Sequence, residues 1–140
     1  MRVITGTARG RVLRTLEGED VRPTTDRVKE AVFSIIQFEI EGRRVLDLFA
    51  GSGQLGIEAL SRGADSATFV DMSKDSLATV KYNLEHTKLG DRAKVIQTDA
   101  LSFLKLTKDR FDIVFIDPPY ASSLVADSMK LLSDAVADGG

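Results

Sequence analysis

The segment VLDLFAGSGQLGIEAL, residues 45–60, holds the residues of this sequence that are best suited to binding a small molecule. Gly51, Gly53 and Gly56 form the pattern G-x-G-x-x-G, in which glycines permit a tight turn and a close approach of the ligand. The pattern is compatible with a dinucleotide site, an S-adenosylmethionine site, or a strand-to-helix turn without a ligand. The glycines alone therefore do not identify a ligand.

The charge of Asp47, which precedes the glycines, distinguishes the two ligands. A dinucleotide places phosphates at the N-terminus of the following helix, where the helix dipole favours them but a carboxylate repels them. S-adenosylmethionine carries an ammonium and a sulfonium, which an aspartate attracts. Unit charges about 4 Å apart interact by about 4 kcal/mol at an effective dielectric constant of ~20, so the sign matters. The sequence therefore predicts S-adenosylmethionine, bound by Asp47, Gly51, Ser52 and Gly53.

Further candidate ligands of this cofactor end the next two predicted strands. Asp71 can accept hydrogen bonds from both ribose hydroxyls, and an exposed turn aspartate is the alternative. Met72 is expected on the adenine face or, alternatively, in the core. Asp99, followed by Ala100, can accept a hydrogen bond from the adenine amino group or cap the helix that begins there.

The motif Asp117-Pro118-Pro119-Tyr120 indicates the chemistry. Two prolines remove two N–H donors, which leaves backbone carbonyls and a carboxylate as a cluster of hydrogen-bond acceptors. Such a cluster suits an –NH₂ group and can turn its lone pair toward a methyl electrophile, with Asp117 as the proton acceptor. Tyr120 offers a face on which a base can stack, worth roughly 1–3 kcal/mol. A strand that ends in a structural Pro-Pro turn is the alternative.

Alternating strands and helices must position these residues. Apolar strands are predicted at 44–50, 66–71, 93–99 and 111–117, and helices after the glycine turn and at 73–90, 100–107 and 122–136. This alternation predicts an α/β fold with a mostly parallel sheet and helices on both faces. Ligands of such sheets bind at the carboxyl ends of the strands, where all these candidates fall. Four strands leave an open edge, so we expect the sequence to be part of a longer domain that lacks C-terminal strands here.

We expect residues 1–22 to form a basic arm and residues 23–140 to form the catalytic domain. The arm contains two possible short strands, at 3–6 and 11–16, which would form a hairpin. A helix is expected over 26–38, with an apolar face made of Val28, Val32, Ile35 and Ile36. Residues 1–14 contain four arginines and no acid, whereas the remainder holds 15 basic and 21 acidic residues. This asymmetry favours contact with a polyanion, and a solubilising terminus is the alternative.

The composition excludes other classes of protein. A chain of 140 residues, 43% hydrophobic and 29% charged, is typical of one globular domain. No apolar run approaches the ~20 residues of a membrane span, and the N-terminus lacks the apolar middle of a signal peptide. There is no cysteine, and His86 is the single histidine, so no metal site is expected. We therefore expect a cytoplasmic protein, with a monomer favoured.

These motifs together resemble a known family. The glycine loop, TFVD, TDA at 98–100 and DPPY resemble class I S-adenosylmethionine-dependent methyltransferases, which have a Rossmann-like fold. TGTARGRVL followed by RPTTDRVKEAVFSII is similar to the RsmD family, bacterial methyltransferases that modify the exocyclic N2 of a guanine in 16S ribosomal RNA. The resemblance covers essentially the whole chain. It departs at Thr5-Gly6-Thr7, where the family usually has two adjacent glycines, and in length, because the family's sheet has seven strands.

The resemblance implies a role for each matching residue. It implies a cofactor pocket lined by Asp47, Gly51, Gly53, Asp71 and Asp99, and a guanine held by Asp117, Pro118, Pro119 and Tyr120. It implies an RNA surface that includes Arg9, Arg11 and Arg22, beside a rim of the active site shaped by Thr24, Asp26, Arg27 and Glu30. The implied partner is ribosomal RNA or a small ribosomal subunit particle. As alternatives, Thr24 and Asp26 only cap a helix, and Arg27 with Glu30 only forms a surface pair.

Other functions stay open at this point. An adenine-N6 methyltransferase acting on DNA or RNA would use the same acceptor cluster. Glutamine-N5 methyltransferases usually have Asn where Asp117 stands. A nicotinamide-dependent oxidoreductase is opposed by Asp47 and by the DPPY motif. An RNA-binding module without catalysis is the non-enzyme alternative.

Overall fold

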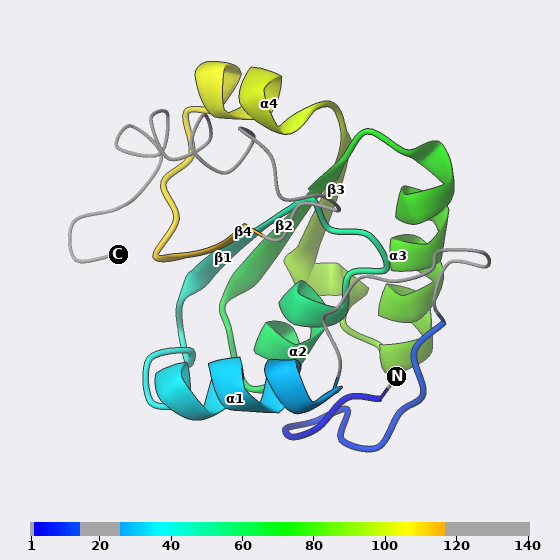
Figure 1. Ribbon diagram of the computed structural model, residues 1–140, viewed down its shortest axis with the longest axis vertical. Coiled ribbons are helices and arrows are strands. Elements are labelled where there is room, and N and C mark those ends of the chain that lie inside the picture. Colours follow the sequence, from blue (N-terminus) through cyan, green and yellow to red (C-terminus); the bar gives the residue numbers. More distant parts are fainter. Residues whose placement is uncertain (1, 15–25, 117–140) are drawn as a thin grey trace.

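The computed structural model describes residues 2–14 and 26–116, with residues 26–28 described by their backbone only. Within these ranges the chain forms a parallel four-stranded sheet with helices on both faces (Figure 1). The strand order is β3-β2-β1-β4, with bounds β1 Arg44–Leu48, β2 Ser66–Asp71, β3 Ala93–Gln97 and β4 Ile113–Ile116. The predicted α/β class is therefore confirmed.

The register of the sheet creates a crevice beside the glycine loop. Leu48 at the end of β1 pairs with Val70 of β2 on one side and with Ile116 of β4 on the other. The chain moves outward from β1 to β2 and β3, and then returns to β4 on the other side of β1. Ligands bind at such a reversal of strand order, outside the carboxyl ends of the strands.

Within the described residues, four α-helices cover the sheet, and their bounds are α1 Asp26–Ile36, α2 Gln54–Ser61, α3 Lys74–Thr87 and α4 Ala100–Leu106. A short 3-10 helix, η1, at Gly90–Arg92 follows α3. Helices α1, α2 and α3 share one apolar cluster with one face of the sheet, whereas α4 packs on the opposite face. Ser73 caps α3 through a hydrogen bond from the Ser76 N–H, and Leu77, Val80 and Leu84 on its inner face are buried.

Two predicted strands end earlier than the sequence pattern indicates. β1 ends at Leu48 rather than at Ala50, because Phe49 adopts a left-handed backbone conformation with φ of 64° and turns the chain out of the sheet. β3 ends at Gln97 rather than at Asp99, because Asp99 begins the next helix as its N-cap. Both early ends lie at the carboxyl edge, where the candidate residues are found.

The buried face of α1 differs from the predicted one. Ile35 is 82% exposed, so its expected place on the apolar face is wrong. Phe33 lies about 200° around the helix from Ile35 and is fully buried, with its ring centroid 5.6 Å from that of Phe115 in β4. Lys29 is also fully buried, on the same face as Val32. The prediction for Ile35 was wrong because it assumed that Lys29 faces solvent, as charged residues ordinarily do. The buried face of the helix is instead the one that carries Lys29 and Phe33.

Over residues 2–14, the part of the arm that the structure describes, the chain reverses direction but does not form two strands. One antiparallel bridge joins Arg2 to Val12. The N–H groups of Ile4 and Thr5 donate to the Glu58 carboxylate on α2 instead of to a second strand. Because α2 satisfies these donors, the predicted strand at 3–6 does not form. Residues 15 and 16 of the other predicted strand lie outside the described residues.

Candidate cofactor site

The glycine loop between β1 and α2 uses each glycine for a separate physical reason. Gly51 and Gly53 have φ values of 59° and 82°, in the left-handed region that favours glycine. Gly53 is the N-cap of α2. Gly56 instead permits close packing, because a Cβ there would lie 2.4 Å from Cε1 of the buried Phe69 ring in β2. The loop therefore forms a tight turn and presses α2 against the sheet, as the pattern predicts.

Asp71, at the carboxyl end of β2, holds the same loop. One carboxylate oxygen accepts a hydrogen bond from the Gly51 N–H at 2.9 Å, and the other accepts one from the Ser73 N–H at 2.8 Å. Asp71 thus joins the glycine loop to the start of α3. The contact of Asp71 with the ribose hydroxyls stays a prediction. Each carboxylate oxygen of Asp71 accepts one of these two bonds and keeps a lone pair with which it can accept a hydroxyl.

Asp47 lies in β1 with its side chain almost completely buried, at 1% exposure. Its carboxylate accepts a hydrogen bond from the Gly56 N–H in the first turn of α2, at 3.0 Å. A negative charge is favoured at this end of a helix, so Asp47 helps to fix α2 behind the loop. The sequence pattern did not indicate this structural bond. The attraction between Asp47 and a cationic cofactor stays a prediction.

Asp99 caps α4, which confirms the structural alternative for this residue. Its carboxylate accepts hydrogen bonds from the Ser102 N–H at 2.8 Å and from the Ser102 hydroxyl at 2.6 Å. The Ser102 hydroxyl is the main cause of a lowered pKa for the Asp99 carboxyl. Ala100 is buried at the first position of the helix. The contact of these two residues with adenine stays a prediction.

Met72 is 70% exposed, so it does not fill the core. It directly follows Asp71 at the carboxyl edge. The alternative prediction, that Met72 lies in the core, is therefore wrong. The contact of Met72 with adenine stays a prediction.

Gln54, the first residue of α2, provides a test of which ligand fits. Its Oε1 atom is buried and accepts no hydrogen bond from any described residue. Buried polar atoms are usually satisfied, so this acceptor suits a ligand that brings an N–H group. The ammonium of S-adenosylmethionine is such a donor, whereas a phosphate only accepts. The loop therefore offers an acceptor that the ammonium of S-adenosylmethionine could satisfy and a phosphate could not.

Asn83 of α3 was not among the predicted residues, but it contacts both the loop and the arm. Its side chain is fully buried. The amide nitrogen donates to the Ser52 carbonyl of the loop and to the Arg14 carbonyl of the arm, each at 2.9 Å. The amide oxygen accepts from the Arg14 N–H at 2.7 Å. The position of Asn83 between Val80 and Leu84, on the buried face of α3, is the signal that could have indicated this role.

Glu58 of α2 was also missed. It is fully buried and forms ion pairs with Lys29 of α1 at 3.2 Å and with Arg62 at 2.8 Å. The same carboxylate accepts the N–H groups of Ile4 and Thr5, so it binds the arm as well. One buried charge therefore connects α1, α2 and the arm.

Several predicted residues lie outside the described part of the chain. These are Arg22, Thr24, Asp117, Pro118, Pro119 and Tyr120. Arg27 and Asp26 belong to α1, but their side chains are not described. Arg9 and Arg11 are described, and both are exposed on the arm.

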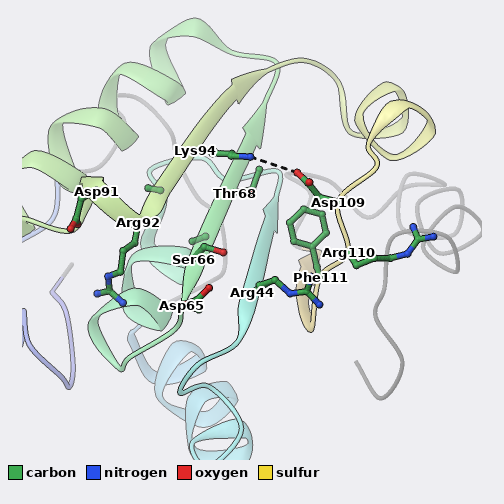
Figure 2. A pocket seen from close by; sticks show the side chains of 12 residues that line it. Arg44, Asp65, Ser66, Thr68, Asp91, Arg92, Lys94, Asp109, Arg110 and Phe111 are labelled. Atoms are coloured by element: carbon green, nitrogen blue, oxygen red, sulfur yellow. Dashed lines mark ion pairs between the residues drawn. The ribbon is translucent and has the colours of Figure 1, made fainter.

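The described residues also form a hollow of about 440 Å³ at the opposite edge of the sheet. Arg44, Ser66, Ala93 and Phe111, which lie at or just before the first residues of the four strands, line it. Figure 2 shows an ion pair across it between Lys94 and Asp109, 3.8 Å apart. The amino ends of the strands are not where parallel sheets bind ligands, so we do not assign the cofactor to this hollow.

The described residues hold neither a metal cluster nor a membrane span. In residues 2–14 and 26–116, no three histidine, cysteine or acidic side chains gather in a way that could hold a metal ion. None of the described helices combines the length and apolar character needed to cross a bilayer.

Comparison of the sequence with known proteins identifies relatives along almost its whole length. A family described as conserved hypothetical protein 95 matches residues 1–137. Ribosomal RNA small subunit methyltransferase D of Haemophilus influenzae is 42% identical over 137 residues, which cover 96% of this chain and 71% of that protein. The protein of the same name in Escherichia coli K12 is 41% identical over 134 residues and is covered to 67%.

Solved structures agree with this relationship. A hypothetical protein from Thermus thermophilus superposes with a TM-score of 0.84 at 34% identity, over 98% of this chain and 80% of that one. A SAM-dependent methyltransferase from Thiobacillus denitrificans, solved with S-adenosyl-L-homocysteine, gives a TM-score of 0.69 at 24% identity, over 88% and 49% of the two chains. The latter shows the common fold. The chain therefore belongs to the RsmD family, whose shared sequence is described as conserved hypothetical protein 95.

Proposed function

We propose that this protein transfers a methyl group from S-adenosylmethionine to the exocyclic N2 amino group of a guanine in 16S ribosomal RNA. The observation that carries the proposal is the continuous similarity of residues 1–137 to one family, which includes the loop and the arm together. Relatives at 41–42% identity bear the name ribosomal RNA small subunit methyltransferase D. The guanine and its N2 atom come from the resemblance of the motifs to the RsmD family.

The carboxyl edge of the sheet would hold the cofactor. When bound, S-adenosylmethionine supplies a methyl group activated by a sulfonium. Gly51, Ser52 and Gly53 would lie against it, and Asp71 would accept the ribose hydroxyls. Met72 is exposed at the position proposed for the adenine face. We propose further contacts from Asp47, Asp99 and Ala100.

The acceptor cluster that follows β4 would hold the guanine. Ile116, the last residue of β4, pairs with Leu48 of β1, three residues before Gly51 of the glycine loop. Asp117 directly follows Ile116 in the sequence and would lie at the same crevice as the loop. Its carboxylate and the nearby carbonyls would hold the amino group, and Asp117 would accept the proton that leaves as nitrogen bonds to the methyl carbon. Tyr120 would stack on the base.

The arm would contact the ribosomal RNA. Arg9 and Arg11 are exposed, which leaves both guanidinium groups accessible to phosphate. We propose that residues 1–22 form the RNA-binding arm, with Arg22, Thr24 and Arg27 beside it, and that 23–140 carry catalysis. The substrate would be ribosomal RNA or a small ribosomal subunit particle, bound by a monomer.

The test is to incubate the protein with methyl-labelled S-adenosylmethionine and small subunits from cells without this activity, and then to map the labelled base. We expect label on a guanine N2. Label on an adenine N6 would favour the alternative methyltransferase. The Asp117→Ala variant should bind the subunits but transfer no label, whereas binding without transfer in the unaltered protein would favour an RNA-binding module.

A further inference from the structure

We propose that Asn83 is a positioning residue that couples the glycine loop to the arm, so that cofactor and RNA strengthen each other's binding. This inference rests on the proposed function, because it takes the loop as the cofactor site and the arm as the RNA contact. The loop and the arm are distant in sequence, and both contact α3 in the structure (Figure 1). Among the described residues, Asn83 is the side chain that bonds to both.

The hydrogen bonds of Asn83 use its whole amide group. Its two N–H protons match two acceptors, the carbonyls of Ser52 and Arg14, both at 2.9 Å from the nitrogen. Its oxygen accepts the Arg14 N–H at 2.7 Å. Because the amide is planar and fully buried, a shift at one partner changes the geometry at the other.

On the loop side, Asn83 donates a hydrogen bond to Ser52, the residue between the two glycines with left-handed backbone conformations. Ser52 lies between Gly51 and Gly53, with φ values of 59° and 82°. Val80, one turn before Asn83, packs on the same turn, because a Cβ on Gly53 would lie 3.2 Å from its Cγ2. One face of α3 thus determines where the loop backbone can lie.

On the arm side, the backbone N–H and carbonyl of Arg14 both form hydrogen bonds with the Asn83 side chain. The Arg14 guanidinium lies 3.7 Å from the centroid of the Tyr82 ring, and Leu13 is buried in the main core. These contacts dock the end of the described arm on α3, three residues after the exposed Arg11. Ordering of the loop by a cofactor would therefore also order the arm, and the effect must be reciprocal.

The experiment measures this coupling directly. S-adenosylhomocysteine, which cannot react, is titrated calorimetrically with and without saturating small ribosomal subunits. We expect subunits to tighten its binding about fivefold or more, which is the lower range of typical coupling. Whatever the affinity of Asn83→Leu for each ligand alone, the ratio of its S-adenosylhomocysteine affinities with and without subunits should fall to about one. Lys81→Ala, on the exposed face of the same helix, should keep the coupling.

Two outcomes overturn the inference while leaving the proposed function intact: no coupling in the unaltered protein that binds both ligands, or full coupling in Asn83→Leu. If the unaltered protein binds neither ligand, the proposed function fails with it. If Asn83→Leu does not fold, amide hydrogen exchange in the unaltered protein decides. S-adenosylhomocysteine should then slow exchange of the Arg14 N–H, and an unchanged rate would refute the coupling.

Discussion

Glu58 illustrates how one buried side chain can join segments that are far apart in the sequence. Its carboxylate faces Lys29 and Arg62 and also accepts two N–H groups of the arm. Removing one member of a buried ion pair leaves the other charge without compensation, which costs far more than an exposed pair contributes. The stability of the arm and of α1 therefore depends on this one residue.

We expect Glu58→Ala to lower the free energy of unfolding by about 3–5 kcal/mol, because the Lys29 ammonium loses a buried partner. Urea-induced unfolding followed by circular dichroism measures this change. Glu85→Ala, an exposed glutamate of α3, is the matched control and should change stability by less than about 0.5 kcal/mol. Equal effects of the two substitutions would contradict the role of Glu58.

Gln54 gives a second prediction for a single residue. Its buried Oε1 atom is unsatisfied among the described residues, which costs about 1–3 kcal/mol. Gln54→Leu should therefore make the free protein at least as stable, while weakening the binding of S-adenosylmethionine. Thermal unfolding and calorimetric titration measure the two effects. Unchanged cofactor affinity would show that Gln54 does not contact the ligand.

At the level of elements, the contact between α2 and β2 depends on a glycine that has no side chain. A Cβ on Gly56 would meet the Phe69 ring at 2.4 Å, and Phe69 is completely buried. The helix and strand can approach this closely only with glycine there. The same helix carries the glycine loop at its N-terminus, so its distance from the sheet also decides where the loop lies.

Gly56→Ala should destabilise the protein by about 1–3 kcal/mol, the usual cost of overpacking a core, and should weaken cofactor binding. Gly90→Ala is the matched control, because a Cβ there would meet its nearest atom, on Leu84, at an ordinary 3.9 Å. Denaturant unfolding and cofactor titration of both variants test the expectation. A stable Gly56→Ala protein with normal affinity would mean that α2 can move away from the sheet without consequence.

At the scale of the whole molecule, the uneven distribution of charge is the feature that bears on RNA binding. The four arginines of residues 1–14 lie in a segment whose apolar residues Val3, Ala8 and Leu13 are part of the main core. The arm is thus fixed to the body rather than attached as a separate tail. A basic surface in a fixed position can contact RNA phosphates in a defined register.

Binding to small ribosomal subunits should weaken linearly on a log–log plot against salt concentration, with a slope of about −0.7 to −0.9 per phosphate contact. Arg9→Ala should reduce the magnitude of the slope by about one unit. Arg43→Ala removes an exposed arginine that lies outside residues 1–22, next to β1 at the amino edge of the sheet, and should leave the slope unchanged. If both variants behave alike, the arm does not provide the phosphate contacts.

The order of residues along the chain was enough to predict the helices and strands and the edge of the sheet at which the candidate residues meet. Apolar strands alternating with helices require a parallel sheet, and polar residues that end such strands must share its carboxyl edge. Short-range chemistry was equally predictable: a helix cap was one of the two roles predicted for Asp99, and the loop glycines serve a turn and a close approach. These inferences succeed because they depend on neighbours within a few positions.

Which polar side chains are buried became evident from the folded arrangement of the described residues and not from the sequence pattern. Asn83 bonds to Arg14, 69 residues away in the sequence, and Glu58 bonds to Ile4, 54 residues away. Helical spacing placed Ile35 inside, but Phe33 and Lys29 are buried instead, because the partner of Lys29 lies on another helix. A charged or amide side chain is stable in a core only when distant segments satisfy it, and no local pattern of residues records where those segments meet.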